Sequence, residues 1–513
     1  MTKENIYITT PIYYVNGEPH IGHFYTTLAC DVLIRLYQNN YYNVRYLTGT
    51  DEHGKKVQQS AEKQAISPKE FCDNVSSKFK QMIIDFDLIQ SQNDFNNGKS
   101  WIRTTDKKHI KFVQNVWQRL EENGWIYKGK YEGWYAIRDE RFYTETELID
   151  GKAPTGAEVE WQEEECYFFK LSLFQEALYQ IYKNSNILQP KGALNEILSF
   201  LEPKNNNKLN DLCISRQKKN VEWGIEVPTD KEHTMYVWID ALFNYFSALG
   251  GDNTEEFDKY WKNGFPIHIM GKEIVRFHSV YWESFIYALY HKSTEVINIE
   301  ELQKLSPKQI FAHGWWLKDG EKMSKSIGNV VSPYDEIEWL QSFGVSREIA
   351  IDYFRYFLIA SVPFGNDGDY SRERLVEMVN AHLVNNIGNL TQRVSSMLVK
   401  NFPEKCNEIS KQYEKLNVEN EIKNIDFNSI LQRILNEATK LNQEFDTLAP
   451  WTLIKGSAED KKKALEILSS FIPKIITLID TLEPFCPHIA SKLFTNLQLN
   501  SMPEIVCKRL VKK

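Results

Sequence analysis

The sequence predicts an α/β fold, in which a parallel sheet is split by an inserted β region and followed by an α-helical bundle. Residues 6–10 are β-branched or aromatic, as in a buried strand, and apolar residues at helical spacing begin near His20. Residues 44–48 predict a second strand, so strand, helix and strand form a βαβ unit with parallel strands. From about residue 371 to residue 497 the apolar residues follow helical stripes, which indicates a helical bundle.

The middle of the chain departs from the βαβ pattern. Residues 131–142 alternate aromatic and polar side chains, which predicts a small antiparallel region inserted into the α/β domain. The parallel sheet is predicted to resume at residues 235–240 and to continue at residues 266–270, followed by a helix with His278 and Trp282 on one face. We therefore expect five segments: 1–115 and 231–310 as the halves of the α/β domain, 116–230 as the insertion, 311–365 as a loop region, and 366–513 as the helical domain.

The composition is that of an ordinary globular protein. Of the 513 residues, 42% are hydrophobic and 25% are charged, and the N-terminus lacks the apolar stretch of a signal peptide. The most apolar run, residues 349–364, contains Asp352 and Arg355 and is too short to span a bilayer. We therefore expect a cytoplasmic protein with no membrane segment. The net charge of −8 argues against indiscriminate binding of nucleic acid, but not against RNA binding through a local basic face.

Two short motifs point to phosphate chemistry. His20, Gly22 and His23 stand where a strand and a turn lead into the first helix, and a helix N-terminus offers unpaired N–H groups to a phosphate. Both imidazoles can donate to one phosphate, although a lone His-x-x-His could also be a chance pair or half of a metal site. Lys322 and Lys325 lie three positions apart in a glycine-flanked stretch, which predicts a mobile loop that closes on a polyphosphate; a solvated basic turn is the alternative.

These motifs, HIGH and KMSKS, resemble the signatures of class I aminoacyl-tRNA synthetases. The surrounding sequences YYVNGEPHIGH and LTGTDEHG are similar to those of the methionyl-tRNA synthetases, and the resemblance covers nearly the whole chain. It implies a Rossmann-type catalytic domain, split by a connective domain and followed by an α-helical anticodon-binding bundle. It also implies that ATP, with Mg²⁺, activates L-methionine to methionyl-adenylate, and that methionine is then transferred to tRNA(Met), including the initiator. Editing of homocysteine, which differs from methionine by one methyl group, is implied as a side activity.

The resemblance assigns site residues by position. It assigns catalysis to His20, His23, Lys322 and Lys325, and ATP binding to these four together with Gly22, Gly271, Lys272 and Glu273. Glu273 stands where the family usually has aspartate, which leaves its role open. An aromatic pocket suits the polarisable sulfur of methionine. The residues assigned to it are Ile12, Tyr14, Asp51, Trp238, Ala241, Leu242, Tyr245, Ile274, His278 and Trp282, with Asp51 on the α-ammonium group. The anticodon is assigned to Asn389, Arg393 and Trp451.

The chain departs from the family pattern in its cysteines. Many relatives carry a zinc knuckle in the connective domain, but this insertion holds only Cys166 and Cys213, so we expect no structural zinc. We also expect a monomer, because no dimerising domain follows the helical bundle. Two other interpretations remain open. A synthetase for another apolar amino acid would usually carry a larger insertion, and a non-synthetase nucleotidyltransferase would not need the helical C-terminal third.

Overall fold

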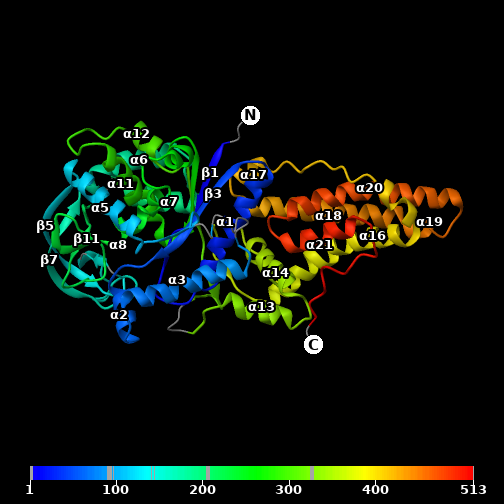
Figure 1. The fold of residues 1–513 in the computed structure, drawn as a ribbon, viewed down its shortest axis with the longest axis horizontal. Helices are drawn as coiled ribbons and strands as arrows, with labels where there is room; N and C mark the ends of the chain where they lie inside the picture. The colour runs from blue at the N-terminus through cyan, green and yellow to red at the C-terminus, as the bar shows by residue number, and fades with distance from the viewer. Residues whose placement is uncertain are drawn as a thin grey trace. The chain divides into compact units, whose positions relative to one another are not determined.

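The computed structural model describes residues 4–88, 95, 98–139, 141–143, 145–203, 208–323 and 328–511 (Figure 1). Two compact units make up the chain: Met1–Pro19 with Asn40–His313, and His20–Asn39 with Gly314–Lys513. The second unit therefore includes one helix from the beginning of the sequence. The five segments expected from the sequence stay a prediction.

A seven-stranded sheet organises the first unit, in the order β2-β3-β1-β13-β14-β8, with β4 beside β3. Every pairing in this sheet is parallel, which confirms the predicted class of sheet. β3 extends through Gly49 to Asp51, beyond the predicted end at residue 48. Gly49 is required there, because a Cβ would lie 1.9 Å from the carbonyl oxygen of Ile102 on β4. The strands are β1 (Asn5–Thr9), β2 (Tyr13–Tyr14), β3 (Asn43–Asp51), β4 (Trp101–Arg103), β8 (Leu188–Gln189), β13 (Phe265–Gly271) and β14 (Gln309–His313).

The insertion contains two antiparallel sheets. One has the order β6-β5-β7-β9 and confirms the predicted antiparallel region; the other has the order β10-β12-β11. The predicted strand at residues 235–240 is wrong, because β12 ends at Met235 and helix α8 (Val237–Leu242) follows. Burial of Ile239 and Leu242 on this helix overrides the weak strand preference of the aromatic and β-branched residues. The strands are β5 (Ile126–Ala136), β6 (Arg141–Tyr143), β7 (Glu160–Phe169), β9 (Leu212–Cys213), β10 (Ser215–Gln217), β11 (Glu226–Val227) and β12 (Asp230–Met235).

Helices cover the sheets of the first unit. Ser67 caps α3, since its hydroxyl accepts a hydrogen bond from the Glu70 N–H, and Pro68 opens the helix. The helix predicted after β13 begins with the short η4 (Lys272–Ile274) and the π-helical turn η5 (Phe277–Tyr281) before it becomes α11. The α-helices are α2 (Lys55–Lys63), α3 (Pro68–Asp85), α5 (Lys107–Glu122), α6 (Gln175–Asn184), α7 (Lys191–Leu201), α9 (Asn244–Ser247), α10 (Glu255–Phe257), α11 (Trp282–Tyr290) and α12 (Ile299–Leu305); short turns are η1 (Glu145–Glu147), η2 (Leu171–Phe174) and η3 (Asp258–Lys262).

A buried carboxyl group lies on α11. Glu283 has no exposed surface, and burial raises its pKa to about 8. The Tyr182 hydroxyl lies 2.6 Å from Glu283 Oε1 and 2.7 Å from the Ser279 carbonyl oxygen. Because this hydroxyl has one proton, it can donate to only one of these two oxygens at a time. With a pKa of about 8, the Glu283 carboxyl group is mostly protonated in the folded protein near pH 7.

The second unit is helical, with a small sheet of order β16-β15-β17. The apolar stripes from Leu383 to Leu398 and from Leu431 to Leu441 are mostly buried, and α16, α18, α20 and α21 pack together, which confirms the predicted bundle (Figure 1). The stretch at residues 401–425 contains two short helical turns with extended chain between them, and it is mostly exposed. The elements are α1 (Ile21–Asn39), β15 (Trp316–Lys318), β16 (Glu321–Lys322), α13 (Pro333–Gln341), α14 (Arg347–Ala360), β17 (Gly368–Asp369), α15 (Arg372–Met378), η6 (Val379–Gly388), α16 (Asn389–Asn401), η7 (Pro403–Glu408), α17 (Glu419–Lys423), α18 (Phe427–Leu448), α19 (Pro450–Leu453), α20 (Ala458–Leu482) and α21 (Pro487–Leu497).

Helix α1 is held in the second unit by buried ion pairs. Asp31 Oδ2 lies 2.6 Å from Arg355 Nη2 on α14 and 3.0 Å from Arg35 Nε. Arg35 also pairs with Glu483 at 3.2 Å, just after α20, and Arg355 donates to the carbonyl oxygens of Pro484 and Phe485. Since Asp31, Arg35 and Arg355 are almost fully buried, removing one partner would leave an uncompensated charge in the interior.

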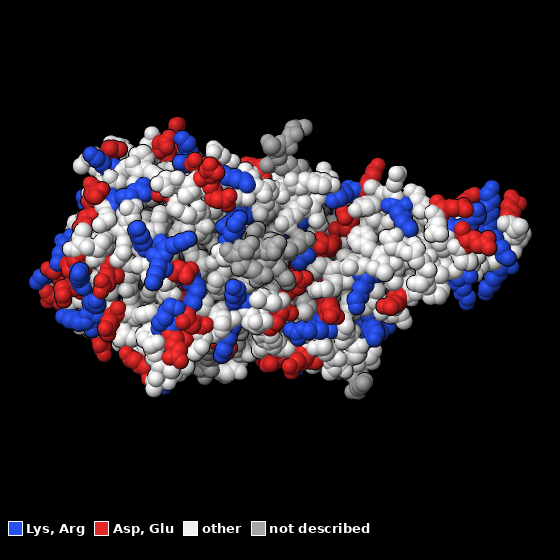
Figure 2. Space-filling view, viewed as in Figure 1, with Lys and Arg blue, Asp and Glu red and all other residues white. Residues whose placement is uncertain are grey.

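Charged residues of both signs are interspersed on the face drawn in Figure 2, in keeping with a net charge of only −8 over 513 residues. Within the described ranges, none of the helices combines the length and the apolar character that crossing a bilayer requires.

Candidate active site

The carboxyl end of the parallel sheet brings several predicted residues to one edge. β1 ends at Thr9, β3 at Asp51 and β13 at Gly271, and these three strands are direct neighbours. In open parallel sheets, ligands bind at this edge. Asp51 is 8% exposed, so its side chain is almost entirely buried at this edge.

The residues after Asp51 are fixed by a dense polar network. Glu52 is fully buried and accepts two hydrogen bonds from Arg103, at 2.6 and 2.9 Å, in a bidentate pair. Its backbone carbonyl oxygen accepts a hydrogen bond from Trp223 Nε1 at 2.6 Å. This network holds the Asp51-Glu52-His53 segment rigidly.

Asp240 joins that segment to helix α8. One carboxylate oxygen accepts a hydrogen bond from His53 Nδ1 at 2.6 Å, and the other accepts one from His109 Nε2 at 2.8 Å. Burial by itself would raise the pKa of Asp240, but the two histidines, His53 more strongly, hold this pKa below its ordinary value. Sequence reasoning missed Asp240, His109 and Arg103; the only signal was an aspartate inside the apolar run of residues 235–242.

A neutral histidine lies among the residues predicted for methionine. His278 Nδ1 lies 3.0 Å from the Ile274 carbonyl oxygen, so it carries the proton and donates. Nε2 is then an acceptor, and it lies 2.7 Å from the Tyr245 hydroxyl oxygen. Burial lowers the pKa of His278 to about 4, so the ring is uncharged near pH 7.

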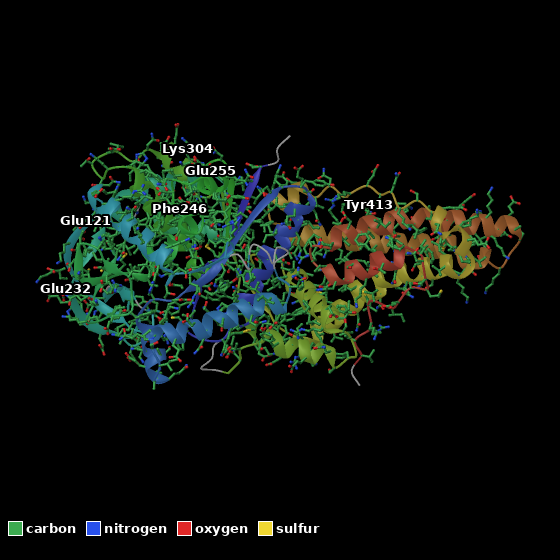
Figure 3. All side chains as sticks on the ribbon, in the orientation of Figure 1. Glu121, Glu232, Phe246, Glu255, Lys304 and Tyr413 are labelled. Atoms are coloured by element: carbon green, nitrogen blue, oxygen red, sulfur yellow. The ribbon has the colours of Figure 1, made fainter. Side chains whose placement is uncertain are left out.

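Aromatic rings pack close to the His278–Tyr245 pair. The Tyr245 and Trp282 rings are 5.6 Å apart, and the Trp238 ring lies flat on Phe277 at 3.7 Å. Phe246, which is labelled in Figure 3, packs edge-on against Trp282 at 4.9 Å. Of the residues predicted for methionine, six share this apolar core of the first unit: Ile12, Trp238, Leu242, Tyr245, Ile274 and Trp282.

Tyr14 is not part of that core. It packs with Tyr13, Val57 and Phe79 in a second apolar cluster of the first unit, and Lys56 lies over its ring at 5.8 Å. Ala241, on α8, is buried. The structure therefore gathers most, but not all, of the predicted side chains in one apolar cluster.

The turn after β13 carries the residues predicted for ATP. Gly271 is buried at the strand end, Lys272 is half-buried and Glu273 is exposed, and both side chains belong to η4. A Cβ on Gly271 would lie 2.8 Å from the Glu273 carboxyl carbon, so the glycine lets this side chain fold back over the strand end. Glutamate thus occupies the position without disturbing the turn.

In the second unit, His20 and His23 form a preorganised pair at the start of α1. The Gly22 N–H donates to His20 Nδ1 at 3.0 Å, the His20 N–H donates to His23 Nδ1 at 3.1 Å, and the two rings are 3.9 Å apart. Since both Nδ1 atoms accept, each neutral ring carries its proton on Nε2. Two N–H donors are therefore set beside the helix N-terminus, as a phosphate site requires.

Only part of the predicted lysine loop is described. Lys322, exposed on β16, places its ammonium group 3.7 Å from the centroid of the Trp315 ring. Lys325 lies outside the described residues, so its predicted role stays a prediction.

In the bundle, the Arg393 guanidinium pairs with Asp446 at 2.8 Å and stacks on Trp451 at 5.1 Å.

The predicted anticodon residues come from two elements of the bundle. Asn389 is exposed and Arg393 partly exposed on α16, while Trp451, on α19, is half-buried with its ring 5.7 Å from Phe445. Trp451 thus both contacts the core and keeps part of its ring accessible.

Cys166 and Cys213, far apart in sequence, come from the paired strands β7 and β9 and share a small apolar cluster with Phe168. In the part of the chain that the structure describes, no group of three or more His, Cys, Asp or Glu side chains is placed to hold a metal ion. The expected absence of zinc stays a prediction.

Three features define a class I aminoacyl-tRNA synthetase. The chain has a parallel sheet with the predicted site at its strand ends, a helix that starts with His-Ile-Gly-His, and a Lys-Met-Ser-Lys segment. Comparison with known proteins narrows the class. The family model described as tRNA synthetases class I (M) matches residues 6–160 and 145–395. A methionine–tRNA ligase of Rickettsia conorii is 41% identical over 99% of this chain and 95% of its own length, and one of Bacillus subtilis is 38% identical over 97% and 74%. The chain belongs to the methionyl-tRNA synthetase family.

Solved structures agree with this assignment. Mycobacterium tuberculosis methionyl-tRNA synthetase in complex with methionyl-adenylate superposes on this chain with a TM-score of 0.81 and 33% sequence identity. The match covers 96% of this chain and 93% of the Mycobacterium chain. The apo form of the same enzyme has a TM-score of 0.75 and 30% identity, and covers 96% and 91%.

Proposed function

We propose that the chain activates L-methionine with ATP and transfers it to the 3′-terminal adenosine of tRNA(Met). A methionine carboxylate oxygen attacks the α-phosphorus, and pyrophosphate leaves. A ribose hydroxyl of the tRNA then attacks the carbonyl carbon of the adenylate, and AMP leaves. The observation that carries the proposal for the amino acid is the buried cluster of aromatic rings around the neutral His278–Tyr245 pair.

The chemistry of this pocket favours a thioether. Sulfur is a weak acceptor and makes favourable contacts with aromatic rings, each worth about 0.3–1.5 kcal/mol. A neutral imidazole does not attract a charged side chain, and Asp51 at the sheet edge supplies the partner for the α-ammonium group. The same pocket would admit homocysteine, because one methyl group is worth only about 1–3 kcal/mol, so editing of homocysteine belongs to this proposal.

For the phosphates, the proposal rests on preorganised donors. His20 and His23 donate through Nε2 to phosphate oxygens on which charge accumulates, and Lys322 and Lys325 neutralise the departing pyrophosphate. Gly271, Lys272 and Glu273 hold the nucleotide at the end of β13. Mg²⁺ enters with ATP and is held mainly by phosphate oxygens, consistent with the lack of a carboxylate cluster among the described residues.

Asn389, Arg393 and Trp451 would read the methionine anticodon of both the initiator and the elongator tRNA. An indole offers a stacking face, and the amide and guanidinium groups can bond base edges. We also propose that the protein acts as a monomer in the cytoplasm.

The proposal is tested by exchange of labelled pyrophosphate into ATP with each amino acid in turn. Methionine alone should support rapid exchange, and equal exchange with isoleucine or valine would refute it. Tyr245→Phe should raise the methionine KM about 2- to 12-fold, the effect of one net hydrogen bond. The matched control is Tyr287→Phe, which removes another buried hydroxyl that accepts from the Asn298 N–H and should leave KM unchanged.

A further inference from the structure

His268 is a buried residue of the pocket region that the motifs did not single out. It lies on β13 directly opposite Thr9 of β1 and has no exposed surface. A histidine in the middle of an apolar strand must satisfy both ring nitrogens inside the protein, because water cannot reach them. Its two partners therefore define what the residue does.

The hydrogen bonds of His268 fix its tautomer. Trp282 Nε1 lies 3.2 Å from His268 Nε2, and an indole N–H can only donate, so Nε2 is an acceptor. The proton is then on Nδ1, which donates to the Thr9 hydroxyl oxygen at 2.7 Å. Burial lowers the pKa of His268 well below its usual value, in agreement with a neutral ring.

The same imidazole also supports Tyr245. The two rings are 4.1 Å apart and inclined by only 29°, so Tyr245 lies flat on His268. Tyr245 in turn donates its hydroxyl to His278, and its backbone carbonyl oxygen accepts from Tyr7. One buried ring thus contacts two of the aromatic residues predicted for methionine: Trp282 through its edge and Tyr245 through its face.

We propose that His268 is a positioning residue that sets the selectivity for methionine, by fixing the orientations of the Trp282 and Tyr245 rings. The proposal rests on the proposed function, since those two rings are expected to contact the substrate. Contacts between sulfur and an aromatic ring depend on where the sulfur meets the ring, whereas a methylene group is less demanding. Loosening the two rings should therefore weaken binding of methionine more than binding of norleucine, its isostere with a methylene in place of sulfur.

The test compares kcat/KM for methionine and norleucine in pyrophosphate exchange. His268→Phe keeps a ring beside Tyr245 but removes the acceptor for Trp282, and we expect the methionine-to-norleucine ratio to fall about 2- to 12-fold, mainly through a higher methionine KM. His268→Gln, whose amide oxygen can accept from the indole, should restore at least half of the lost selectivity. Thr9→Val, which removes the partner of Nδ1–H, should shift the ratio in the same direction even if the His268 variants fail to fold.

A control variant and two outcomes decide whether His268 sets the selectivity for methionine. His233→Phe removes another buried histidine of the first unit, one that pairs with Asp230 and the Glu165 carbonyl oxygen, and it should leave the ratio unchanged. An unchanged ratio in His268→Phe and Thr9→Val, with kcat lowered equally for both amino acids, would overturn the inference and leave His268 as packing. If the wild-type chain shows no methionine-dependent exchange at all, it is the proposed function that fails.

Discussion

A single methyl group at Gly22 should separate catalysis from stability. In Gly22→Ala, the new Cβ would lie 2.9 Å from His20 Cε1 and 3.1 Å from Nδ1, closer than such atoms normally approach, so the imidazole must move by a few tenths of an ångström. This ring is already fixed by the Gly22 N–H and by His23 at 3.9 Å. A displacement of 1 Å can cost about 100-fold in rate, so we expect methionine activation to fall about 10-fold.

The thermal stability of the Gly22→Ala variant should not fall with its activity. Alanine is favoured over glycine inside a helix by up to about 1 kcal/mol, so the thermal midpoint should stay the same or rise. Pyrophosphate exchange and calorimetry measure the two effects on one preparation. Gly192→Ala is the matched control, because Gly192 is also the second residue of its helix, α7, and a Cβ there meets nothing within 4 Å. If Gly22→Ala keeps exchange within twofold of the wild type, His20 does not act as a positioned donor.

Three further outcomes follow from the buried groups and the bundle. The pKa of the Glu283 carboxyl group is raised from 4.5 to about 8. Its contribution to the free energy of unfolding is therefore complete below about pH 4.5 and is lost as the pH rises towards 8. In Glu283→Gln, the free energy of unfolding should fall less steeply between about pH 5 and pH 8, as measured by chemical denaturation. Asp240→Asn leaves one of the two histidines without an acceptor, so the free energy of unfolding should fall by about 1.5–3 kcal/mol. The methionine KM should rise as well. If neither value changes, Asp240 does not hold the segment that contains Asp51. Trp451→Ala should weaken tRNA recognition by about 1–3 kcal/mol in aminoacylation and leave pyrophosphate exchange intact, whereas parallel losses with a lowered thermal midpoint would mark Trp451 as a core anchor.

The parts of the fold that local pattern determines were predictable. The strands within residues 6–10 and 266–270 have buried side chains on both faces, as in a covered sheet, and the Ser67-Pro68 pair is a local signal for a helix start. The run at residues 235–240 has the same local appearance but becomes α8, since its conformation depends on what packs around it. Short apolar runs of this kind cannot be assigned by periodicity alone.

The residues of the candidate site also fall into two groups, those that a local pattern predicts and those that depend on distant partners. His20 and His23 were predictable because their spacing and their place after a strand are local. Asp240 was not, because its histidine partners are 187 and 131 residues away in sequence, and no local pattern encodes such a pairing. His268 was missed for the same reason, as Thr9 is 259 residues distant.

The ion pair between Asp31 and Arg355 has a consequence for synthesis of the chain on the ribosome. The two residues are separated by 324 positions, so α1 leaves the ribosome long before its partners exist. At about 5–20 residues per second, the wait is on the order of 16 to 65 s. Throughout that time Asp31, which is buried among the apolar residues of α1 in the folded protein, lacks its partner on α14. The buried ion pair that joins α1 to α14 can therefore form only after Arg355 has been synthesised, so this contact belongs to a late stage of folding.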